Sequence, residues 1–459
     1  MGVLENKTVV GFVPFGIHVN VEDGLGRQFI DYELLENSKG SLVEQGFHVI
    51  GAKEVISYKN QAAEALTLLM NEKADVLVLY STTWMWASEI MWLAKSFNRP
   101  VILWSPATSR GWTNVGALEV HGALEEIGVE HKFIIGQFDD ERTMKKIRAF
   151  CKAAKAKHRL QGTTLGLVGG RGMGETTGSA DPSQWMMNFG IDIEHMDQMV
   201  VIQEAKAVDF PSVEKAYDEV KAKFDYIPAL EGVMEKSIRL YIAMKKIYSE
   251  RGFDMAAVKC YPELGDNYAT PCLAQSLLAD EGFTSACIGD LNTALTAQIM
   301  GNFTDVAVFS GDIQQVRYWE NVVKIVCDGA CPPSLAGKCK TCGVCSRGLP
   351  SEGAAGGMGV SAILKKGRCT LVHIARMKGR FTMHIAPGEV FEPDVADLDE
   401  LLRDCGMPHW THAYVKIDGN GEDFYQNQLG EFVCLAYGDI EEELVDFCNL
   451  ADITPIITK

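Results

Sequence analysis

The sequence predicts an α/β protein with two Rossmann-like parallel-sheet domains followed by a β-rich C-terminal domain. Three observations predict this class: short apolar runs separated by helical stretches through most of the chain, strand patterns with few helices between them after about residue 356, and a length of 459 residues. A chain of this length has room for about three domains. We place them at 1–161, 162–355 and 356–459.

The first domain alternates strand and helix patterns. We expect its strands at 9–13, 47–50, 74–80, 100–104 and 132–135. Short β-branched runs separated by helices are typical of a parallel sheet that is covered on both faces.

The second domain begins at Thr164, and its expected strands are 165–168, 199–202, 256–260, 285–288, 306–309 and 322–326. A long helical stretch covers 211–249. Gly169 to Gly174 follow the first of these strands, but their spacing does not give G-x-G-x-x-G, so we interpret them as a sharp turn rather than a dinucleotide loop. The third domain is expected to contain strands at 370–374, 380–385, 411–417 and 432–437 and a helix at 441–450.

Charge and composition narrow the class of partner. The chain carries 61 acidic and 43 basic side chains, a formal net charge of −18. Nucleic acids and anionic membranes need clustered Lys and Arg, so neither is expected as a partner. No apolar run approaches the roughly 20 residues of a membrane span, and the first residues show no secretory signal. The sequence therefore predicts a cytoplasmic protein that acts on a small molecule.

Carboxylates follow three expected strands of the second domain. Glu263 comes after 256–260, Asp290 after 285–288, and Asp312 after 306–309. Ligand sites in parallel sheets lie beyond the carboxyl ends of the strands. Converging carboxylates there can hold a hard divalent cation or act as acid and base, whereas single ones more often cap helices or favour loops. We expect Glu263 and Asp290 to face one cavity, with Asp312 near it.

Several short motifs resemble the L-fucose isomerase family in its broad sense, which includes the L-arabinose-isomerase-like enzymes. They are Pro262-Glu263, Pro271-Cys272, Cys287-x-x-Asp290, Pro332 to Ala336, His412 to Val415, and Ala436 to Ile440 with Glu442 to Leu444. The resemblance implies two α/β domains, a β-rich C-terminal domain and an oligomer. It also implies aldose–ketose isomerisation at a Mn²⁺ site made by two carboxylates and a histidine.

Two positions depart from that family pattern. Ile288 stands where the family often has Glu, and Phe432 stands where the metal-binding His is expected. Phenylalanine cannot bind a metal, so Glu431, His384 or His412 would have to replace it. We take Glu263 as base or ligand, Asp290 as ligand and His412 as the third ligand. A single His on a strand is more often a hydrogen-bonded structural residue.

A cysteine cluster is the strongest chemical motif of the sequence. Cys339, Cys342 and Cys345 have the two-residue gaps of ferredoxin clusters, and Cys331 is followed by Pro332, as a fourth ligand often is. We predict a [4Fe–4S] cluster on these four thiolates, with Cys327 in reserve. Zinc is the alternative, although zinc sites more usually pair two separate C-x-x-C knuckles. Unligated thiols are the third interpretation.

Together these patterns predict a sugar-isomerase-like enzyme, an intramolecular oxidoreductase of carbohydrate metabolism, acting on a sugar or a small polyhydroxy compound as a homo-oligomer. Two alternatives remain open. An iron–sulfur-dependent lyase, dehydratase or redox enzyme on the same fold would explain the cysteines and the two departures. A non-catalytic sugar-binding protein with a structural cluster would explain them without chemistry.

Overall fold

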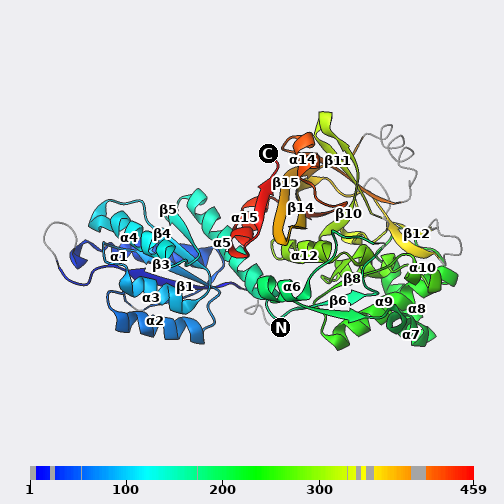
Figure 1. The fold of residues 1–459 in the computed structure, drawn as a ribbon, viewed down its shortest axis with the longest axis horizontal. Helices are drawn as coiled ribbons and strands as arrows, with labels where there is room; N and C mark the ends of the chain where they lie inside the picture. The colour runs from blue at the N-terminus through cyan, green and yellow to red at the C-terminus, as the bar shows by residue number, and fades with distance from the viewer. Residues whose placement is uncertain are drawn as a thin grey trace. The chain divides into compact units, whose positions relative to one another are not determined.

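The computed structural model describes residues 7–20, 26–52, 54–172, 174–327, 329–337, 343–347 (backbone only), 356–393 and 410–459 (Figure 1). The chain forms two compact units. Unit 1 consists of Met1–Arg159 with Val445–Leu450, and unit 2 consists of Leu160–Leu444 with Ala451–Lys459. Within the described residues, no helix is both long enough and apolar enough to cross a bilayer.

Unit 1 contains a five-stranded parallel sheet in the order β2-β1-β3-β4-β5. Its strands are β1 Val9–Phe15, β2 His48–Gly51, β3 Val76–Ser81, β4 Val101–Ser105 and β5 His131–Ile135. β3 and β4 are buried along their whole length, because helices cover both faces of the sheet. All five strands predicted for the first domain are confirmed.

The helices of unit 1 pack on the sheet through apolar stripes. They are α1 Tyr32–Glu44, α2 Lys59–Asn71, α3 Ser88–Phe97, α4 Thr113–Glu126 and α5 Glu141–Leu160. Leu69, Leu93 and Leu124 bring α2, α3 and α4 into one apolar core. Lys132 on β5 pairs with Asp446 at 2.6 Å, which ties the segment Val445–Leu450 to unit 1.

Unit 2 begins with a four-stranded parallel sheet in the order β7-β6-β8-β9. Its strands are β6 Thr164–Val168, β7 Asp192–Met196, β8 Met255–Val258 and β9 Thr284–Ala286. The accompanying helices are α6 Pro182–Phe189, α7 Gln198–Ala207, α8 Phe210–Lys221, α9 Gly232–Arg251, α10 Glu263–Asn267, α11 Cys272–Asp280 and α12 Leu291–Met300.

Two expected elements of this region are wrong. The apolar run at 199–202 lies in α7, because the Asp197 carboxylate accepts a hydrogen bond from Met199 N at 2.8 Å and so caps a helix. The strand lies just before it, as β7. The strand expected at 306–309 begins only at Phe309, as β10 Phe309–Arg317, so Asp312 lies within that strand rather than after one. The helical stretch expected at 211–249 is confirmed and is divided between α8 and α9.

The rest of unit 2 is a closed antiparallel barrel of six strands. Each strand pairs with the next in the order β14-β17-β10-β11-β16-β15, and β15 pairs back with β14. The strands are β10 Phe309–Arg317, β11 Val322–Cys327, β14 Gly367–Met377, β15 Arg380–Val390, β16 Thr411–Ile417 and β17 Phe432–Tyr437. β18 Thr454–Ile457 adds to β15 in parallel. β12 Gly343–Arg347 and β13 Gly357–Ser361 form a separate pair, and the helices are α14 Gly421–Asn427 and α15 Glu441–Leu450.

The barrel confirms the β-rich C-terminal region and the α/β class. β10 and β11 were expected to continue the second parallel sheet, but they pair antiparallel with β17 and β16 instead. Phe309, Leu371 and Leu435 from three barrel strands share one apolar core. The barrel therefore stands beside the second parallel sheet within the same compact unit.

Candidate active site

The carboxyl ends of β6, β8 and β9 are each followed by a turn that carries polar groups. The glycine-rich turn follows β6, Lys259 to Glu263 follow β8, and Asp290 follows β9. This is the edge at which parallel sheets bind ligands. The loop before β17 of the barrel reaches the same edge, since Phe432 packs against Cys260 and Ile288.

Asp290 is a buried carboxylate that caps a helix. Its Oδ1 accepts a hydrogen bond from Thr293 N at 2.9 Å and its Oδ2 accepts one from Thr293 Oγ1 at 2.9 Å, so it is the N-cap of α12. Asp290 is only 3 % exposed, and burial raises its pKa. Glu175 nearby raises the pKa further, because two like charges repel.

The glycine-rich turn closes over Asp290. A Cβ on Gly172 would lie 2.0 Å from the Ile288 carbonyl oxygen, and a Cβ on Gly178 would lie 2.9 Å from the Asp290 carboxyl carbon. Gly289 has a φ of +72° and faces the Gly170 carbonyl oxygen. These glycines are required because only a bare backbone fits so close to the carboxylate.

Glu175 and Glu431 form a second acidic pair beside Asp290. Glu175 accepts a hydrogen bond from Thr177 N at 3.0 Å and another from Thr177 Oγ1, which lowers its pKa. Glu431 lies just before β17, and burial together with the Glu175 charge raises its pKa. The two carboxyl groups lie close enough to shift each other's pKa in opposite directions. These shifts favour a protonated Glu431 beside an ionised Glu175.

His373 on β14 supplies a neutral imidazole near this pair. It is buried, and burial lowers its pKa to about 4. Its Nε2 atom makes no hydrogen bond within the part of the chain that the structure describes. A Cβ on Gly430 would lie 2.8 Å from that Nε2 atom, so the loop residue next to Glu431 packs directly on the ring.

The other two candidate histidines are on β15 and β16, and His384 lies directly opposite His373 in the register of β14 and β15. His384 Nδ1 bonds to Gln428 Oε1 at 3.1 Å and its Nε2 to Thr458 Oγ1 at 2.8 Å, so both ring nitrogens have structural partners. His412 lies on β16, buried, with its ring stacked on Tyr414 at a centroid distance of 6.4 Å. The assignment of His412 as a metal ligand stays a prediction.

Glu263 lies at the start of α10, on the same edge of the sheet. Its carboxylate pairs with Lys259 Nζ at 2.6 Å, and this bond lowers its pKa. Glu263 and Lys259 line a hollow together with Gly169, Gly170, His195, Met196, Asp197 and Gln198. The glycine-rich turn touches both this hollow and the Asp290 loop, so Glu263 and Asp290 flank one turn. That they bind one metal ion stays a prediction.

Phe432 and Asp312 lie opposite each other in the barrel. They are paired in the register of β17 and β10. Phe432 is buried against Ile288, so the two residues that depart from the family pattern are in contact with each other. An apolar pair therefore borders the polar groups of the site.

The cysteine motif falls largely outside the described residues. Cys339 and Cys342 are not described, and Cys345 lies in β12, of which only the backbone is described. Cys331 and the reserve ligand Cys327 are buried in the apolar core around the barrel. The [4Fe–4S] cluster and its zinc alternative stay predictions.

Glu175 and His373 are the site residues that sequence reasoning missed. Glu175 follows Gly174 in a run interpreted only as a turn, and the next residues, Thr176 and Thr177, are typical of a carboxylate-binding loop. His373 carries no sequence signal, since it stands in an apolar strand and meets the loop before β17 only because β14 pairs with β17 in the barrel.

The donor types of this set suit a divalent metal ion, but no three of their ligand atoms lie within 4.8 Å of one another in the described chain, so the side chains would have to close on the ion. Asp290, Glu175 and Glu431 offer carboxylate oxygens, and His373 offers a buried neutral nitrogen without a hydrogen-bond partner in the described chain. Carboxylates with one imidazole are ligands that Mn²⁺ accepts. A bound cation would also offset the repulsion among the three carboxylates.

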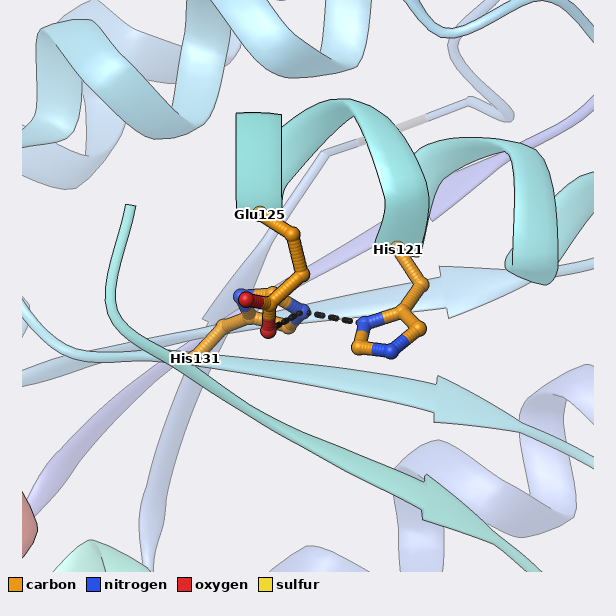
Figure 2. A group of neighbouring side chains, drawn as sticks. All are labelled: His121, Glu125 and His131. Atoms are coloured by element: carbon orange, nitrogen blue, oxygen red, sulfur yellow. Dashed lines mark hydrogen bonds and ion pairs between the residues drawn. The ribbon is translucent and has the colours of Figure 1, made fainter. Parts of the chain in front are cut away.

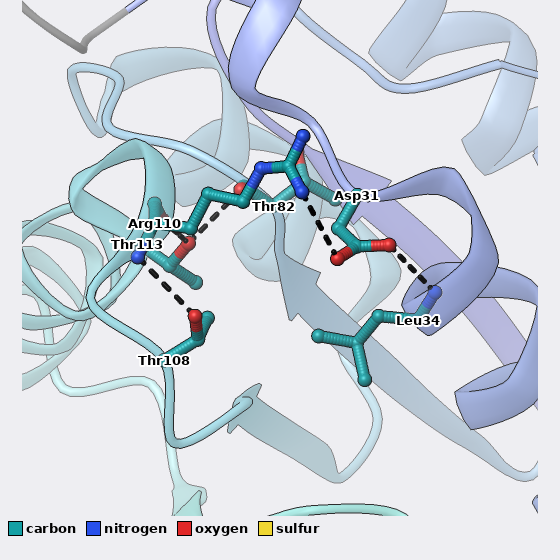
Figure 3. Close-up of polar contacts among 6 residues, drawn as sticks. All are labelled: Asp31, Leu34, Thr82, Thr108, Arg110 and Thr113. Atoms are coloured by element: carbon teal, nitrogen blue, oxygen red, sulfur yellow. Dashed lines mark hydrogen bonds and ion pairs between the residues drawn. The ribbon is translucent and has the colours of Figure 1, made fainter.

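Unit 1 has a polar cluster of its own at the carboxyl edge of its sheet (Figure 3). Asp31 caps α1 by accepting from Leu34 N at 3.0 Å, and Arg110 Nη1 lies 3.5 Å from its other oxygen. Thr113 Oγ1 donates to the Thr82 carbonyl at 3.0 Å. The Arg110 side chain is 53 % exposed, so the ion pair adds little stability and the guanidinium stays accessible.

The sequence matches two domain profiles of one enzyme family. The first N-terminal domain of L-fucose isomerase matches residues 29–162, and the C-terminal domain of L-fucose isomerase matches residues 331–458. The second match covers the strands from β12 to β18.

Individual enzymes match at low identity. A sulfoquinovose isomerase of Clostridium sp. (strain MSTE9) is 26 % identical over 57 % of this chain and 61 % of its own length. One from Priestia aryabhattai is 20 % identical over 98 % of this chain and 99 % of its own. An L-arabinose isomerase of Pediococcus pentosaceus is 23 % identical over 37 % of each chain. The two domain matches and these relatives agree with the fold, and the chain belongs to the L-fucose isomerase family.

Proposed function

We propose that this protein is an aldose–ketose isomerase that moves a proton between C1 and C2 of a monosaccharide at the Glu175–Glu431–Asp290 site. The observation that carries the proposal is the neighbouring pair of carboxyls Glu175 and Glu431, whose pKa values are shifted in opposite directions. A carboxyl pair whose pKa values are pushed apart provides one base and one acid at the same pH. Isomerisation needs both, because one proton leaves C2 as another reaches the carbonyl oxygen.

The side chains divide the reaction between them. Ionised Glu175, held by Thr177, takes the proton from C2 of the aldose, and protonated Glu431 donates to O1, giving an enediol. Return of the proton to C1 and loss of the O2 proton give the ketose and restore the pair. The apolar contact of Phe432 with Ile288 keeps water from one side of the site.

A divalent cation, with Mn²⁺ as the first choice, would be held by Asp290 and His373, beside the pair Glu175 and Glu431. It would supply polarisation of the carbonyl and the neighbouring hydroxyl. The set Glu263, Asp290 and His412 is the alternative. Mn²⁺ affinities of Glu263→Gln, His373→Gln and His412→Asn distinguish the two, because only the true ligand set weakens binding when it is changed.

The substrate is proposed to be a monosaccharide aldose. Because the relatives include sulfoquinovose and L-arabinose isomerases, the first panel contains sulfoquinovose, L-arabinose and L-fucose. Isomerisation in D₂O is the decisive assay, since deuterium enters the transferred position only if a protein base removes the proton. If none of the three sugars exchanges, although binding is seen by calorimetry, the protein is a sugar-binding protein and the proposal fails.

Glu431→Gln tests the acid role. The amide keeps the shape but has no acidic proton, so we expect kcat/KM to fall roughly 10²- to 10⁴-fold. Glu219→Gln, on the exposed side of α8, is the matched control and is expected to keep full activity. Equal rates for the Glu431→Gln variant and the wild type would remove Glu431 from the mechanism.

The cysteine motif supports a second candidate, an iron–sulfur enzyme on the same fold. Its support is the spacing of Cys339, Cys342 and Cys345 with Cys331 upstream. Anaerobically purified protein would contain about four irons per chain and absorb broadly near ~400 nm. One zinc per chain without iron or sulfide, in iron-replete cells, would contradict this candidate.

A further inference from the structure

Three side chains of unit 1, outside the proposed active site, gather where α4 meets β5 (Figure 2). His121 and Glu125 stand four residues apart on α4, so they share one face of the helix. His131 is the first residue of β5, after the turn that contains Gly128 with a φ of +63°. One ligand atom from each of the three lies within 4.8 Å of the others.

The tautomer of His131 is fixed by the backbone. Its Nδ1 bonds to the Val129 carbonyl oxygen at 2.8 Å, and since a carbonyl only accepts, Nδ1 carries the proton. Its Nε2 therefore presents a lone pair, which lies 2.7 Å from His121 Nδ1. An imidazole that donates one N–H to a backbone carbonyl and offers the other nitrogen is typical of a histidine metal ligand.

The third donor is Glu125, a long side chain at the surface. Glu125 Oε1 lies 4.0 Å from His131 Nε2, and the Glu125 side chain is 66 % exposed whereas that of His131 is 1 % exposed. The buried imidazole thus sets the position, and the exposed carboxylate has room to close on it. Phe133 packs on the His121 ring at a centroid distance of 4.8 Å and limits its rotation.

We propose that His121, Glu125 and His131 form a binding site for a divalent transition metal ion of the Zn²⁺ type, with a fourth position open to water. The ion replaces the hydrogen atom that lies between His121 Nδ1 and His131 Nε2. The proton of His121 Nδ1 moves to its Nε2, so both imidazoles stay neutral. Tetrahedral zinc needs its two nitrogens about 3.3 Å apart, which requires an opening of about 0.6 Å.

The donor set selects the class of ion. Two neutral imidazoles and one carboxylate favour Zn²⁺, Co²⁺, Ni²⁺ or Cu²⁺ over Mg²⁺ or Ca²⁺, which prefer oxygen ligands alone. The ion would join α4 to β5 at the edge strand of the sheet, across the turn 127–130. The site thus fastens a helix to an edge strand and presents an exchangeable coordination position at the surface.

The site is tested by comparing zinc binding to the full-length wild type with zinc binding to variants that each lack one proposed ligand. Equilibrium dialysis with metal analysis compares the wild type with His121→Asn, Glu125→Gln and His131→Asn. His48→Asn, an exposed imidazole on β2 of the same sheet, is the matched control. Any zinc bound by the cysteine motif or by the carboxylates of unit 2 is the same in all five proteins, so it cancels in the comparison.

We expect the two histidine variants to bind one zinc fewer per chain than the wild type and the His48→Asn control. Glu125→Gln is expected to weaken zinc binding roughly 10- to 100-fold, as the loss of a supporting group does at other zinc sites. Because Glu125 is exposed, this variant stays folded even if a histidine variant does not. Equal zinc content and affinity in all five proteins would overturn the proposal.

A spectroscopic count of ligands provides a second readout. With one equivalent of Cu²⁺, pulsed electron paramagnetic resonance is expected to detect two coordinated imidazoles in the wild type and one in the His131→Asn variant. The same spectrum from both proteins would show that the copper lies elsewhere, and the site would be a hydrogen-bonded histidine pair only.

Discussion

Asp290 has two opposing effects on the stability of the folded protein. As the N-cap of α12 it stabilises the helix through two hydrogen bonds to Thr293, and as a buried carboxylate it costs free energy whenever it is ionised. A residue kept under that cost is usually needed for chemistry, so the two effects are best separated by substitution.

Asp290→Asn separates the cap from the charge. The amide oxygen still caps α12, so we expect no loss of stability, whereas activity should be abolished. The folded-state pKa of Asp290 is raised, so wild-type stability falls as pH rises above its unfolded value of 3.8, and the variant has no such loss. In metal-free protein the melting temperature of the variant should therefore exceed that of the wild type increasingly as pH rises through this window.

Asp290→Ala is the control for the cap. It removes the charge and the cap together, so it should be less stable than Asp290→Asn by about 0.5–2 kcal/mol. Identical melting temperatures of the two variants would show that the cap contributes nothing.

His373 gives the opposite dependence on pH. Its folded pKa of about 4 lies below its ordinary value of 6.5, so the folded state binds fewer protons than the unfolded state. Stability is complete above pH 6.5 and falls as the pH drops toward 4, by about 3 kcal/mol in total. Urea unfolding in EDTA at several pH values should show this slope in the wild type and not in His373→Gln. Equal slopes would mean that the imidazole is not buried.

Individual site residues were only partly predictable. Asp290 could be named because it follows an apolar strand, where the chain direction places it on the sheet edge, and Glu431 because it stands next to the position of the histidine that the family resemblance implies. The partnership of Glu175 with Glu431 could not, because it depends on a barrel loop that meets the glycine-rich turn from far along the chain. Neither periodicity nor spacing encodes such a contact.

At the scale of elements, the glycine-rich turn after β6 controls the distance between the second sheet and the Asp290 loop. Gly172→Ala places a Cβ 2.0 Å from the Ile288 carbonyl oxygen, a backbone atom that cannot yield alone. We expect a loss of about 1–3 kcal/mol in stability and a larger loss of activity, because Asp290 is displaced with the loop.

Gly40→Ala is the control for that substitution. Gly40 lies in α1 with nothing within 4 Å of a Cβ, so alanine should stabilise the helix by about 0.5–1 kcal/mol and leave activity unchanged. Thermal unfolding with activity assays on both variants checks the pair. Full activity of Gly172→Ala would show that the turn does not position the site.

Elements of the first sheet were predictable because its three inner strands, β1, β3 and β4, are buried on both faces and form apolar runs in the sequence. The apolar run at 199–202 was predicted as a strand for the same reason, although a buried helix face can also form a short apolar run. Asp197 makes it a helix, because it caps the first turn of α7. β11 was recognised as a strand and β10 only at its first residue, Phe309. The partners of both were missed, because antiparallel pairing with β17 and β16 joins distant parts of the chain.

At the scale of the whole molecule, unit 1 is completed by a segment from the far end of the chain. Lys132 Nζ pairs with Asp446 Oδ2 at 2.6 Å, and both side chains are largely buried. Lys132→Met leaves the Asp446 charge without this partner, so we expect a loss of about 3–5 kcal/mol. Lys132→Met with Asp446→Leu removes both charges and should recover most of it. Scanning calorimetry of the two proteins tests the coupling, and equal losses would contradict it.

The α/β class, the β-rich end and the family could all be predicted from the sequence. The three-domain division and the homo-oligomer stay predictions. The closed barrel was not foreseen, because its strands come from both sides of the cysteine-rich segment and only two of its pairings, β10 with β11 and β14 with β15, are local.

That barrel has a consequence for how the protein is made. The sheet of unit 1 is complete once residue 135 has left the ribosome, so it can form while the rest is being translated. β10 and β11 must instead wait for β16 and β17, and β15 lacks its last neighbour until residues 454–457 appear. During this interval the nascent strands expose unpaired edges, which attract other chains. Chaperones that shield nascent chains will therefore govern the yield of unit 2 far more than that of unit 1.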